Sequence, residues 1–574
     1  MKKLKKLTAM LLSLIMVMLF AVPVLAAGNY TITIQNDKEG HTYEAYQIFA
    51  GDVSSDEPQA GNEKGPILSN IVWGTGVGVN GPELLKALKA ADADKYGDCT
   101  TAADVAEALG TENANAADAA AFAKIAAGHL TKTVEGTATE PVNGNYVIDN
   151  LAAGYYLVKD QDGSLDGDAD AATEYIVQVL GNVTMDPKDS EIPTVEKKVS
   201  EEDYRQDDGY GTTYNDVADW DIGDSVPFKL IGSIPDMSAY DTYGYIFNDT
   251  LSNGLTLQED TINVYIARDR DDEVREYTPL TEGVDYTLTL NNVANGGGSF
   301  SIAFDDLKTA PYMEQGNRNY VIVTYDATLN ANAEVGLPGN PNSVDLQFSN
   351  NPNGDGLGRT EKDTVIVFTY ELDGTKVDGA DQDTKLEGAE FVLFNGGHTR
   401  VALIQDGKVV DWINLPQGYN YENYKDISYE TWQEFSGQNN DVIISSDAEG
   451  VFGVSGLDDG TYYLMEIKAP TGYNLMENEK ELAINATTTN GQNWAGMAGD
   501  ALTALQILVD EGDAQTGNTD TGIVNIIVTN NQGATLPETG GMGTTLFYII
   551  GGLLVVGAGI LLIVRFRMRA GSEE

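Results

Sequence analysis

The chain has 574 residues and carries 34 Lys and Arg against 88 Asp and Glu, which gives a formal net charge of −54. So acidic a surface repels phosphate, which argues against a protein that binds nucleic acid. The single cysteine, Cys99, excludes an intrachain disulfide, and three histidines are too few and too scattered for a histidine-based metal site or a Ser–His catalytic pair.

The N-terminal segment is typical of a secretory signal peptide. Four lysines within the first six residues precede an apolar run over residues 7–25, and Ala26 supplies the small residue before a cleavage site. We therefore expect residues 1–26 to be removed on secretion. The alternative is a retained membrane anchor, which the shortness of the apolar run disfavours.

Residues 28–187 are predicted to form a first domain of mixed α/β type. A strand-like segment opens it, three alanine-rich segments with helical spacing follow, and further strand-like segments close it. The expected helices cover 82–90, 102–109 and 116–127, and the expected strands cover 30–34, 146–148, 155–158 and 175–179.

An acidic run within this domain, residues 160–170, could bind calcium through its carboxylates. It lacks the central glycine and the terminal glutamate of an EF-hand loop. We therefore favour a solvated acidic loop, with the calcium site as the alternative, and expect neither a metal nor a cofactor in the protein.

Two consecutive β-rich stretches follow, residues 188–361 and 362–534. Apolar and polar residues alternate over 195–200, and strand-like runs bounded by Asn and Gly turns recur through both stretches. Many short strands with little helix favour β-sandwiches of the immunoglobulin-like type. The expected fold class is therefore mainly β, with tandem sandwich domains of which the first carries inserted helices.

One element is repeated between the first and third domains. Residues 150–160 and 456–467 share a Leu-x-x-Gly turn that is followed by two tyrosines and an apolar strand. Glu466 in the second copy is matched by Lys159 in the first. Because a lysine cannot act as a carboxylic acid, the two domains are expected to differ in any chemistry that depends on this position.

The C-terminus combines three features. An apolar stretch over 546–564 is long enough to cross a bilayer as a helix, and three arginines follow it. Just before it stands the pentapeptide Leu536, Pro537, Glu538, Thr539 and Gly540. Together these features resemble the cell-wall sorting signal of Gram-positive surface proteins, here 536–574. The resemblance implies that the cysteine of a sortase cleaves after Thr539 and passes its acyl group to an amine, so the chain spans the membrane only before sorting.

Glu466 lies on an apolar strand face with Tyr462 and Leu464, where a carboxylate is costly unless it is protonated or paired. The segment from Tyr462 to Tyr473 resembles the E-box of Cna B-type domains. In that family the glutamic acid catalyses an isopeptide bond between a lysine near the domain's start and an asparagine on its last strand. The resemblance implies Lys376 and Asn530; a buried Lys376–Glu466 salt bridge without a bond is the alternative.

The second domain resembles the isopeptide-forming, Cna A-like domain of backbone pilins. Lys197 shares a strand face with valines, and Asp249 shares one with Phe247 and Leu251. The resemblance implies a bond between Lys197 and Asn350 with Asp249 as the acid. Asn342 has the same parity as Asn350, which means that both face the same side of their strand, and Asn342 is the main rival. The structural alternative is that these residues occupy ordinary turn or edge positions.

The segment 183–188 stands between the first two domains. It resembles the Tyr-Pro-Lys motif whose lysine accepts the preceding subunit in sortase-polymerised pilins, although Asp186 replaces the tyrosine. Pro187 keeps the residue before it extended. The resemblance implies Lys188 as the acceptor, and an ordinary solvated linker lysine is the alternative.

The order of these features resembles a major (backbone) pilin of the Spa/Ebp type over essentially the whole chain. The resemblance implies a structural protein on the cell surface, not an enzyme apart from its own isopeptide formation. The implied partners are a sortase, identical subunits joined head to tail, minor tip and base pilins, and peptidoglycan. The alternative is a monomeric wall-anchored adhesin that binds host matrix.

Overall fold

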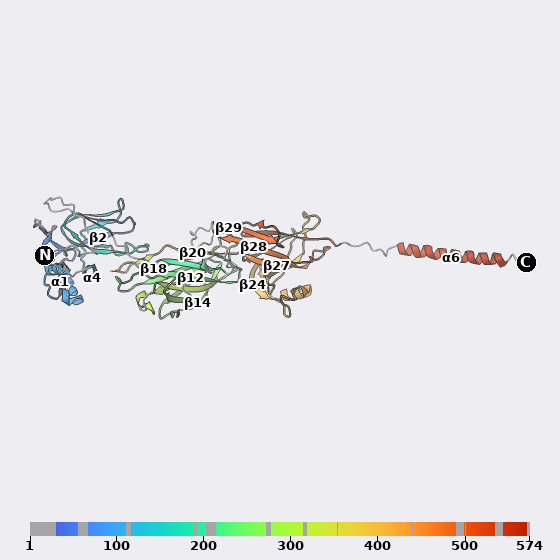
Figure 1. Cartoon of the computed structure of the whole chain (residues 1–574), viewed down its shortest axis with the longest axis horizontal. Coiled ribbons are helices and arrows are strands. Elements are labelled where there is room, and N and C mark those ends of the chain that lie inside the picture. Colours follow the sequence, from blue (N-terminus) through green and yellow to red (C-terminus); the bar gives the residue numbers. More distant parts are fainter. Residues whose placement is uncertain are drawn as a thin grey trace, which may run out of the picture.

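The computed structural model shows three domains in a row along the long axis, followed by one long helix (Figure 1). The fold is mainly β, as the sequence predicts. The structure describes residues 30–54, 67–110, 116–186, 192–201, 214–270, 277–313, 318–352, 354–438, 441–488, 499, 501–533 and 543–570. The expected signal peptide 1–26, Lys188 and the pentapeptide 536–540 lie outside these residues.

The first domain has two sheets and a helical subdomain. One sheet has the order β5-β1-β8, and the other has the order β3-β2-β6-β7 with β4 beside β2. The strands are β1 (Tyr30–Ile34), β2 (Tyr43–Ser54), β3 (Ile67–Trp73), β4 (Gly136–Ala138), β5 (Tyr146–Leu151), β6 (Gly154–Asp160), β7 (Glu174–Val179) and β8 (Val183–Met185). The helices are η1 (Gly78–Asn80), α1 (Gly81–Ala91), α2 (Ala93–Tyr96), α3 (Ala102–Leu109) and α4 (Ala116–Ala127).

The three helices expected in this domain are confirmed as α1, α3 and α4. Helix α3 begins at a capping box, in which Thr101 and Asp104 each bond the other's backbone N–H. Leu84 and Leu88 of α1 and Val105 of α3 are fully buried in one cluster, which explains why the apolar residues recur at helical spacing.

The second domain is a sandwich of two sheets, with the orders β10-β9-β12-β17-β14 and β11-β20-β18-β13-β16-β15. The first sheet contains β9 (Val195–Ser200), β10 (Tyr214–Asn215), β12 (Ser225–Ser233), β14 (Leu255–Ala267) and β17 (Tyr320–Leu329). The second contains β11 (Val217–Asp219), β13 (Tyr245–Leu251), β15 (Thr287–Asn291), β16 (Gly298–Phe304), β18 (Asn340–Ser349), β19 (Leu357–Arg359) and β20 (Asp363–Phe368), and η3 (Leu307–Thr309) lies outside both sheets. A single apolar core fills the space between the sheets.

The boundary expected between residues 361 and 362 is wrong. Strand β20 pairs with β18 and β11 and therefore belongs to the second domain. The apolar run that suggests one strand is divided at Thr369, and β21 begins at Tyr370 in a different sheet. The third domain therefore begins at about this point.

The third domain is built on one long sheet with the order β30-β29-β28-β27-β22-β23-β24-β26-β21-β31. Its first and last long strands, β21 and β31, pair in parallel. The strands are β21 (Tyr370–Asp378), β22 (Glu390–Asn395), β23 (Arg400–Gln405), β24 (Lys408–Asn414), β25 (Ile444–Ser445), β26 (Val451–Leu457), β27 (Gly460–Lys468), β28 (Lys480–Thr488), β29 (Leu502–Val509), β30 (Gln515–Thr516) and β31 (Ile523–Asn530). The helical elements are η5 (Tyr424–Asp426) and α5 (Tyr429–Ser436).

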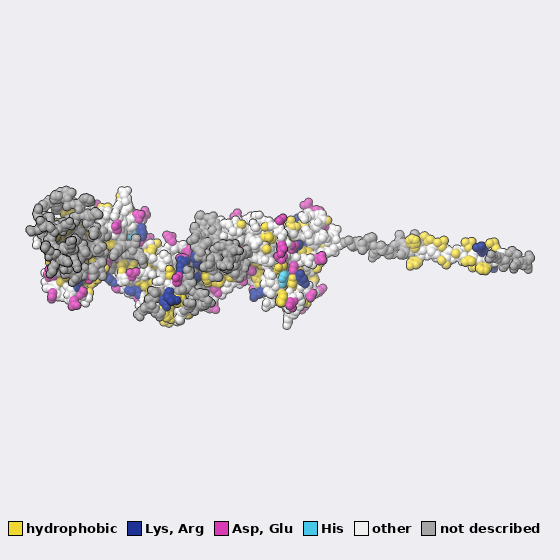
Figure 2. Space-filling model, viewed as in Figure 1, with side chains coloured by type: hydrophobic (Ala, Val, Ile, Leu, Met, Phe, Trp, Pro, Cys, Tyr) yellow, Lys and Arg dark blue, Asp and Glu magenta, His cyan; other side chains and the backbone are white. Residues whose placement is uncertain are grey.

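Helix α6 (Gly543–Ala570) extends beyond the third domain (Figure 1). Its segment Phe547–Met568 is long and apolar enough to cross a membrane, and it touches nothing else in the described part of the chain. The exposed apolar side chains of this helix appear in Figure 2 as a patch far from the acidic surface of the domains.

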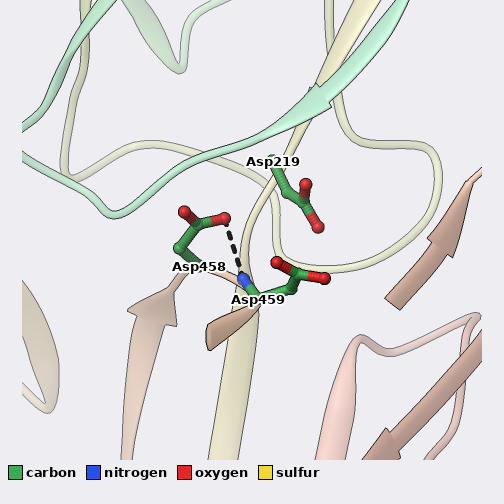
Figure 3. Close-up of side chains that lie close together, drawn as sticks. All are labelled: Asp219, Asp458 and Asp459. Carbon is green, nitrogen blue, oxygen red and sulfur yellow. Dashed lines mark hydrogen bonds between the residues drawn. The ribbon is translucent and has the colours of Figure 1, made fainter. Parts of the chain in front are cut away.

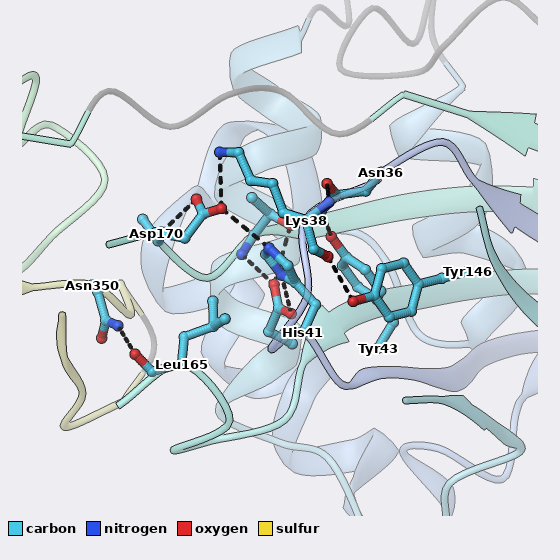
Figure 4. Close-up of polar contacts among 11 residues, drawn as sticks. Asn36, Lys38, His41, Tyr43, Tyr146, Leu165, Asp170 and Asn350 are labelled. Carbon is cyan, nitrogen blue, oxygen red and sulfur yellow. Dashed lines mark hydrogen bonds and ion pairs between the residues drawn. The ribbon is translucent and has the colours of Figure 1, made fainter. Parts of the chain in front are cut away.

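The acidic loop after β6 contacts the second domain (Figure 4). Asn350 donates through Nδ2 to the carbonyl oxygen of Leu165 at 2.7 Å, and the backbone N–H of Gly167 donates to the carbonyl of Leu357 at 2.8 Å. The expectation of a freely solvated loop is therefore wrong for this part of the run, because its backbone serves as a contact between two domains.

His41 holds the two ends of that loop together (Figure 4). Its Nδ1 lies 2.8 Å from Asp160 and its Nε2 lies 3.3 Å from Asp170, while Lys38 pairs with Asp170 at 2.8 Å. Burial alone would lower the pKa of His41, but the hydrogen bonds and charges of the two aspartates outweigh it and raise the pKa to about 9. His41 is therefore positively charged at neutral pH.

Asp221 makes the corresponding contact between the second and third domains. Its carboxylate accepts hydrogen bonds from the backbone N–H of Asp458 at 2.8 Å, from the hydroxyl of Tyr462 at 3.0 Å and from Nε1 of Trp412 at 2.7 Å. Burial raises the pKa of Asp221 to about 7, against the effect of these three donors. The joint therefore contains a carboxyl group that titrates near neutral pH.

Candidate functional site

Lys376, Glu466 and Asn530 come together in the core of the third domain. They lie on β21, β27 and β31, and each points to the buried face of its strand; their exposed fractions are 0%, 4% and 2%. On β27 the alternation that buries Tyr462 and Leu464 also buries Glu466. The structure thus brings together the three residues that sequence reasoning assigned to this domain.

The three side chains contact one another directly. Nζ of Lys376 lies 2.8 Å from Oε1 of Glu466 and donates to Oδ1 of Asn530. Nδ2 of Asn530 donates to both carboxyl oxygens of Glu466, at 3.0 and 2.9 Å. The backbone N–H of Met476 donates to Oε2 of Glu466 at 2.8 Å, which further fixes the carboxyl group. One carboxyl group therefore touches both the amine and the amide nitrogen.

Burial lowers the pKa of Lys376 despite the neighbouring carboxyl of Glu466. Its Nζ also lies 5.2 Å from the centre of the buried Phe391 ring, which adds an apolar neighbour to the amine. A neutral amine beside an amide carbonyl is a nucleophile in contact with an acyl group. The arrangement can therefore form an amide between Lys376 and Asn530.

Lys197 and Asp249 form a second buried site, in the core of the second domain. Lys197 lies on β9 and Asp249 on β13, so the pair bridges the two sheets of the sandwich, and neither side chain is exposed. Their Nζ and Oδ2 atoms are in direct contact. The hydroxyl of Tyr325, on β17, accepts from Nζ of Lys197 at 2.7 Å and donates to Asp249 at 3.0 Å.

The asparagine at this site is Asn342, and the expectation of Asn350 is wrong. Nδ2 of Asn342 donates to the Tyr325 hydroxyl at 2.9 Å, so it shares this partner with Lys197. Asn350 lies beyond the end of β18 and donates instead to Leu165 of the first domain. The two asparagines have the same strand parity but stand at opposite ends of the strand.

Burial governs the charges at this second site. It lowers the pKa of Lys197 to about 8, although Asp249 favours the charged amine, and it raises the pKa of Asp249. Among the described side chains, Oδ1 of Asp249 and Oδ1 of Asn342 are buried without a hydrogen-bond partner. If Asp249 carries the proton instead of Lys197, the amine is neutral, and the carboxyl group supplies the hydrogen-bond donor that the site lacks.

Tyr325 is a member of this buried site that sequence reasoning did not identify. It shares strand parity with Val321 and Val323, which are buried, so an inward direction could have been inferred. Nothing in the sequence indicates that its hydroxyl meets a lysine and an asparagine from two other strands.

The repeated element of the first domain carries no such site at its matching position. Lys159 pairs with Asp162 at 2.6 Å near the surface.

Three carboxylates at the joint between the second and third domains, those of Asp219, Asp458 and Asp459, lie within 4.8 Å of one another and are close enough to share a cation (Figure 3).

Comparisons with known proteins locate two families in the chain. The model of the SpaA prealbumin-like fold domain matches residues 371–495, and that of the LPXTG cell wall anchor motif matches residues 528–569. The chain is similar to the trypsin-resistant surface T6 protein of Streptococcus pyogenes serotype M6, with 24% identity over 421 residues that cover 66% of this chain and 69% of the relative.

Solved structures with similar folds include two pilins. The T6 backbone pilin of serotype M6 Streptococcus pyogenes has 16% identity and a TM-score of 0.49, with 89% of this chain and 100% of that chain covered. The major pilin SpaD from Corynebacterium diphtheriae has 18% identity and a TM-score of 0.44, with 88% and 98% covered.

The β-sandwich domains and the C-terminal anchor define a secreted surface protein that is attached to the cell wall. The prealbumin-like SpaA domain, the anchor motif and the likeness to the T6 surface protein together support a surface protein of a Gram-positive cell wall. The SpaA match contains Lys376 and Glu466, and the anchor match contains Asn530.

Proposed function

We propose that the chain is the backbone subunit of a covalently polymerised pilus whose second and third domains each form an internal Lys–Asn isopeptide bond. The observation that carries this proposal is the pair of buried lysine–acid–asparagine sites, whose members are in direct contact in the third domain and are joined through the Tyr325 hydroxyl in the second. Two such sites in successive domains of a chain with one cysteine supply covalent links that disulfides cannot.

The reaction in the third domain joins the side chains of Lys376 and Asn530. The neutral amine attacks Cγ of Asn530, and the carbonyl electrons move to Oδ1. The carboxyl group of Glu466, which contacts both nitrogens, takes the extra proton from Nζ and passes one proton to Nδ2. The Cγ–Nδ2 bond then breaks, ammonia leaves, and an amide between Nζ and Cγ remains. The amide joins the first and last long strands of the domain.

The reaction in the second domain joins Lys197 and Asn342, with Asp249 as the acid. The bond connects β9 to β18 and thus fastens one sheet of the sandwich to the other. Apart from these two self-modifications, we propose that the protein is structural and has no enzymatic activity.

Polymerisation requires a separate enzyme. We propose that a sortase cleaves after Thr539 within Leu536–Gly540 and joins that carbonyl to Lys188 of the next identical subunit. Successive transfers give a head-to-tail chain, with minor tip and base pilins at its ends and peptidoglycan as the final acceptor. The net charge of −54 opposes assembly by surface contact alone, which favours a covalent joint.

Mass spectrometry of the full chain tests the internal bonds. Two bonds release two ammonia molecules, so the intact mass should fall short of the sequence mass by about 34 Da. A full sequence mass would refute the bonds. Polymerisation is tested separately, by a ladder of high-mass species in boiled wall extracts; a single band would favour the alternative of a monomeric adhesin.

A further inference from the structure

We propose that Tyr325 is a catalytic residue of bond formation in the second domain, where its hydroxyl relays a proton from the attacking nitrogen of Lys197 to the leaving nitrogen of Asn342. This inference rests on the proposed Lys197–Asn342 bond. It adds to the lysine, acid and asparagine a fourth group that touches both reacting nitrogens.

The hydrogen-bonding capacity of a tyrosine hydroxyl matches its surroundings here. A hydroxyl has one proton to donate and two lone pairs to accept with. Tyr325 donates to Oδ2 of Asp249 at 3.0 Å and accepts from Nζ of Lys197 at 2.7 Å and from Nδ2 of Asn342 at 2.9 Å. All of its capacity is therefore directed at the three members of the site.

The chemistry requires a proton to move between the two nitrogens. When Nζ attacks Cγ, the new bond leaves an extra proton on Nζ, while Nδ2 can depart only if it gains one. The site offers no path through solvent, because Lys197, Asp249 and Asn342 are fully buried and Tyr325 is 1% exposed. A group in contact with both nitrogens is therefore needed, and the Tyr325 hydroxyl is such a group.

The relay balances without a further reactant. Tyr325 receives one proton from Nζ and gives its own to Nδ2, whose lone pair is no longer delocalised in the tetrahedral intermediate. The Cγ–Nδ2 bond breaks as the Cγ–Oδ1 double bond re-forms, and ammonia leaves. The hydroxyl is regenerated, and the new amide joins Nζ to Cγ. Burial raises the pKa of Tyr325 well above its ordinary value, so the hydroxyl keeps a proton to give.

The third domain explains why only one of the two sites uses a tyrosine. There the carboxyl of Glu466 reaches both nitrogens itself, at 2.8 Å from Nζ of Lys376 and at 2.9 and 3.0 Å from Nδ2 of Asn530. Asp249 is shorter by one methylene and contacts Nζ of Lys197 and the hydroxyl of Tyr325. The hydroxyl extends the reach of the shorter acid to the leaving nitrogen.

The test follows bond formation over time in the full chain, made in a cell-free system with detergent and digested to release the cross-linked peptides. Tyr325→Phe should slow formation of the Lys197–Asn342 peptide by about 10²-fold, the lower end of the range for general acid–base catalysis. The Lys376–Asn530 peptide of the same molecules should form at the unchanged rate, which makes the third domain an internal standard.

Tyr245→Phe is the matched control. Tyr245 is also fully buried in this sandwich, but its hydroxyl donates to the carbonyl of Ser233 at 2.8 Å, away from the site. This variant loses one buried hydrogen bond and should keep the rate of the Lys197–Asn342 bond. An equal slowing in both variants would assign the effect to weakened packing and overturn the relay.

The remaining outcomes separate the relay from the bonds themselves. An unchanged rate in Tyr325→Phe overturns the relay and leaves both bonds standing, whereas an unaltered chain without either cross-linked peptide overturns the proposed function and the relay with it. If Tyr325→Phe does not fold, 3-fluorotyrosine at position 325 keeps the shape but lowers the hydroxyl pKa; an unchanged rate there would also overturn the relay.

Discussion

Replacing Glu466 by alanine should prevent the bond in the third domain and lower the stability of that domain by a predictable amount. The bond closes a loop between positions 154 residues apart. The chain-entropy relation for a cross-link of this length gives about 5 kcal/mol at 25 °C. For a domain of this size each kcal/mol shifts the melting temperature by about 2–4 °C, so the third domain should melt about 10–20 °C lower.

Two measurements on the same sample check this prediction. After the mass change of the substitution itself is subtracted, Glu466→Ala should be about 17 Da heavier than the unaltered chain, because one ammonia is retained. Calorimetry should show a lower transition for the third domain and an unchanged one for the second, since the sites lie in separate cores.

Glu387→Ala is a suitable control for this variant. Glu387 lies in the loop before β22 of the same domain and is exposed. A surface substitution of this kind changes stability by about 0.5 kcal/mol or less, so it should change the melting temperature little and the mass only by the substitution. If Glu466→Ala still loses the ammonia of the third-domain bond, the role of Glu466 is refuted. If that ammonia is lost and the melting temperature nevertheless falls, the substitution has only weakened the packing.

Three further predictions concern other parts of the chain. Lys188→Ala should abolish the boiled-extract ladder and leave a wall-anchored monomer, whereas Lys132→Ala, which changes an exposed lysine of the first domain, should not; a ladder that persists in Lys188→Ala would show that another lysine is the acceptor. His41 has a folded-state pKa of about 9 against an ordinary 6.5, so its stabilisation of the first domain is complete below pH 6.5 and lost as the pH rises through 9. In His41→Gln the melting temperature of the first domain should therefore fall less over this pH range, and an equal fall in the variant and the unaltered chain would contradict the assignment. Asp221 has a pKa of about 7 against an ordinary 3.8, so its contribution is complete below pH 3.8 and lost as the pH rises through 7. Protease cleavage at the joint should therefore increase over that range, and Asp221→Asn should weaken this pH dependence, although the neighbouring Asp458 also has a raised pKa.

Strand parity located most of the candidate residues because it reports directly which side chains face the core. It identified the inward directions of Lys197, Asp249 and Glu466, all of which are buried. Parity could not separate Asn342 from Asn350, which are eight residues apart and therefore about 26 Å apart along an extended strand. Position along the strand depends on register with neighbouring strands, which no local pattern encodes.

The division between the second and third domains was not predictable for a related reason. The apolar run from Val365 to Tyr370 reads as one strand, yet it supplies the end of β20 and the start of β21. Thr369 lies between them, fully buried, with its hydroxyl bonded to the carbonyl of Leu457. An apolar pattern shows that a segment is buried, but the sheet that buries it is decided by contacts distant in sequence.

The parallel pairing of β21 and β31 has a mechanical consequence for a fibre pulled from its two ends. With the proposed amide in place, a pulling force enters the third domain at Tyr370, runs along β21 to Lys376, crosses to Asn530 and leaves. Residues 377–529 stand outside that path and bear no load. The domain can therefore accept insertions such as the segment around α5 without any change in the length or compliance of the fibre.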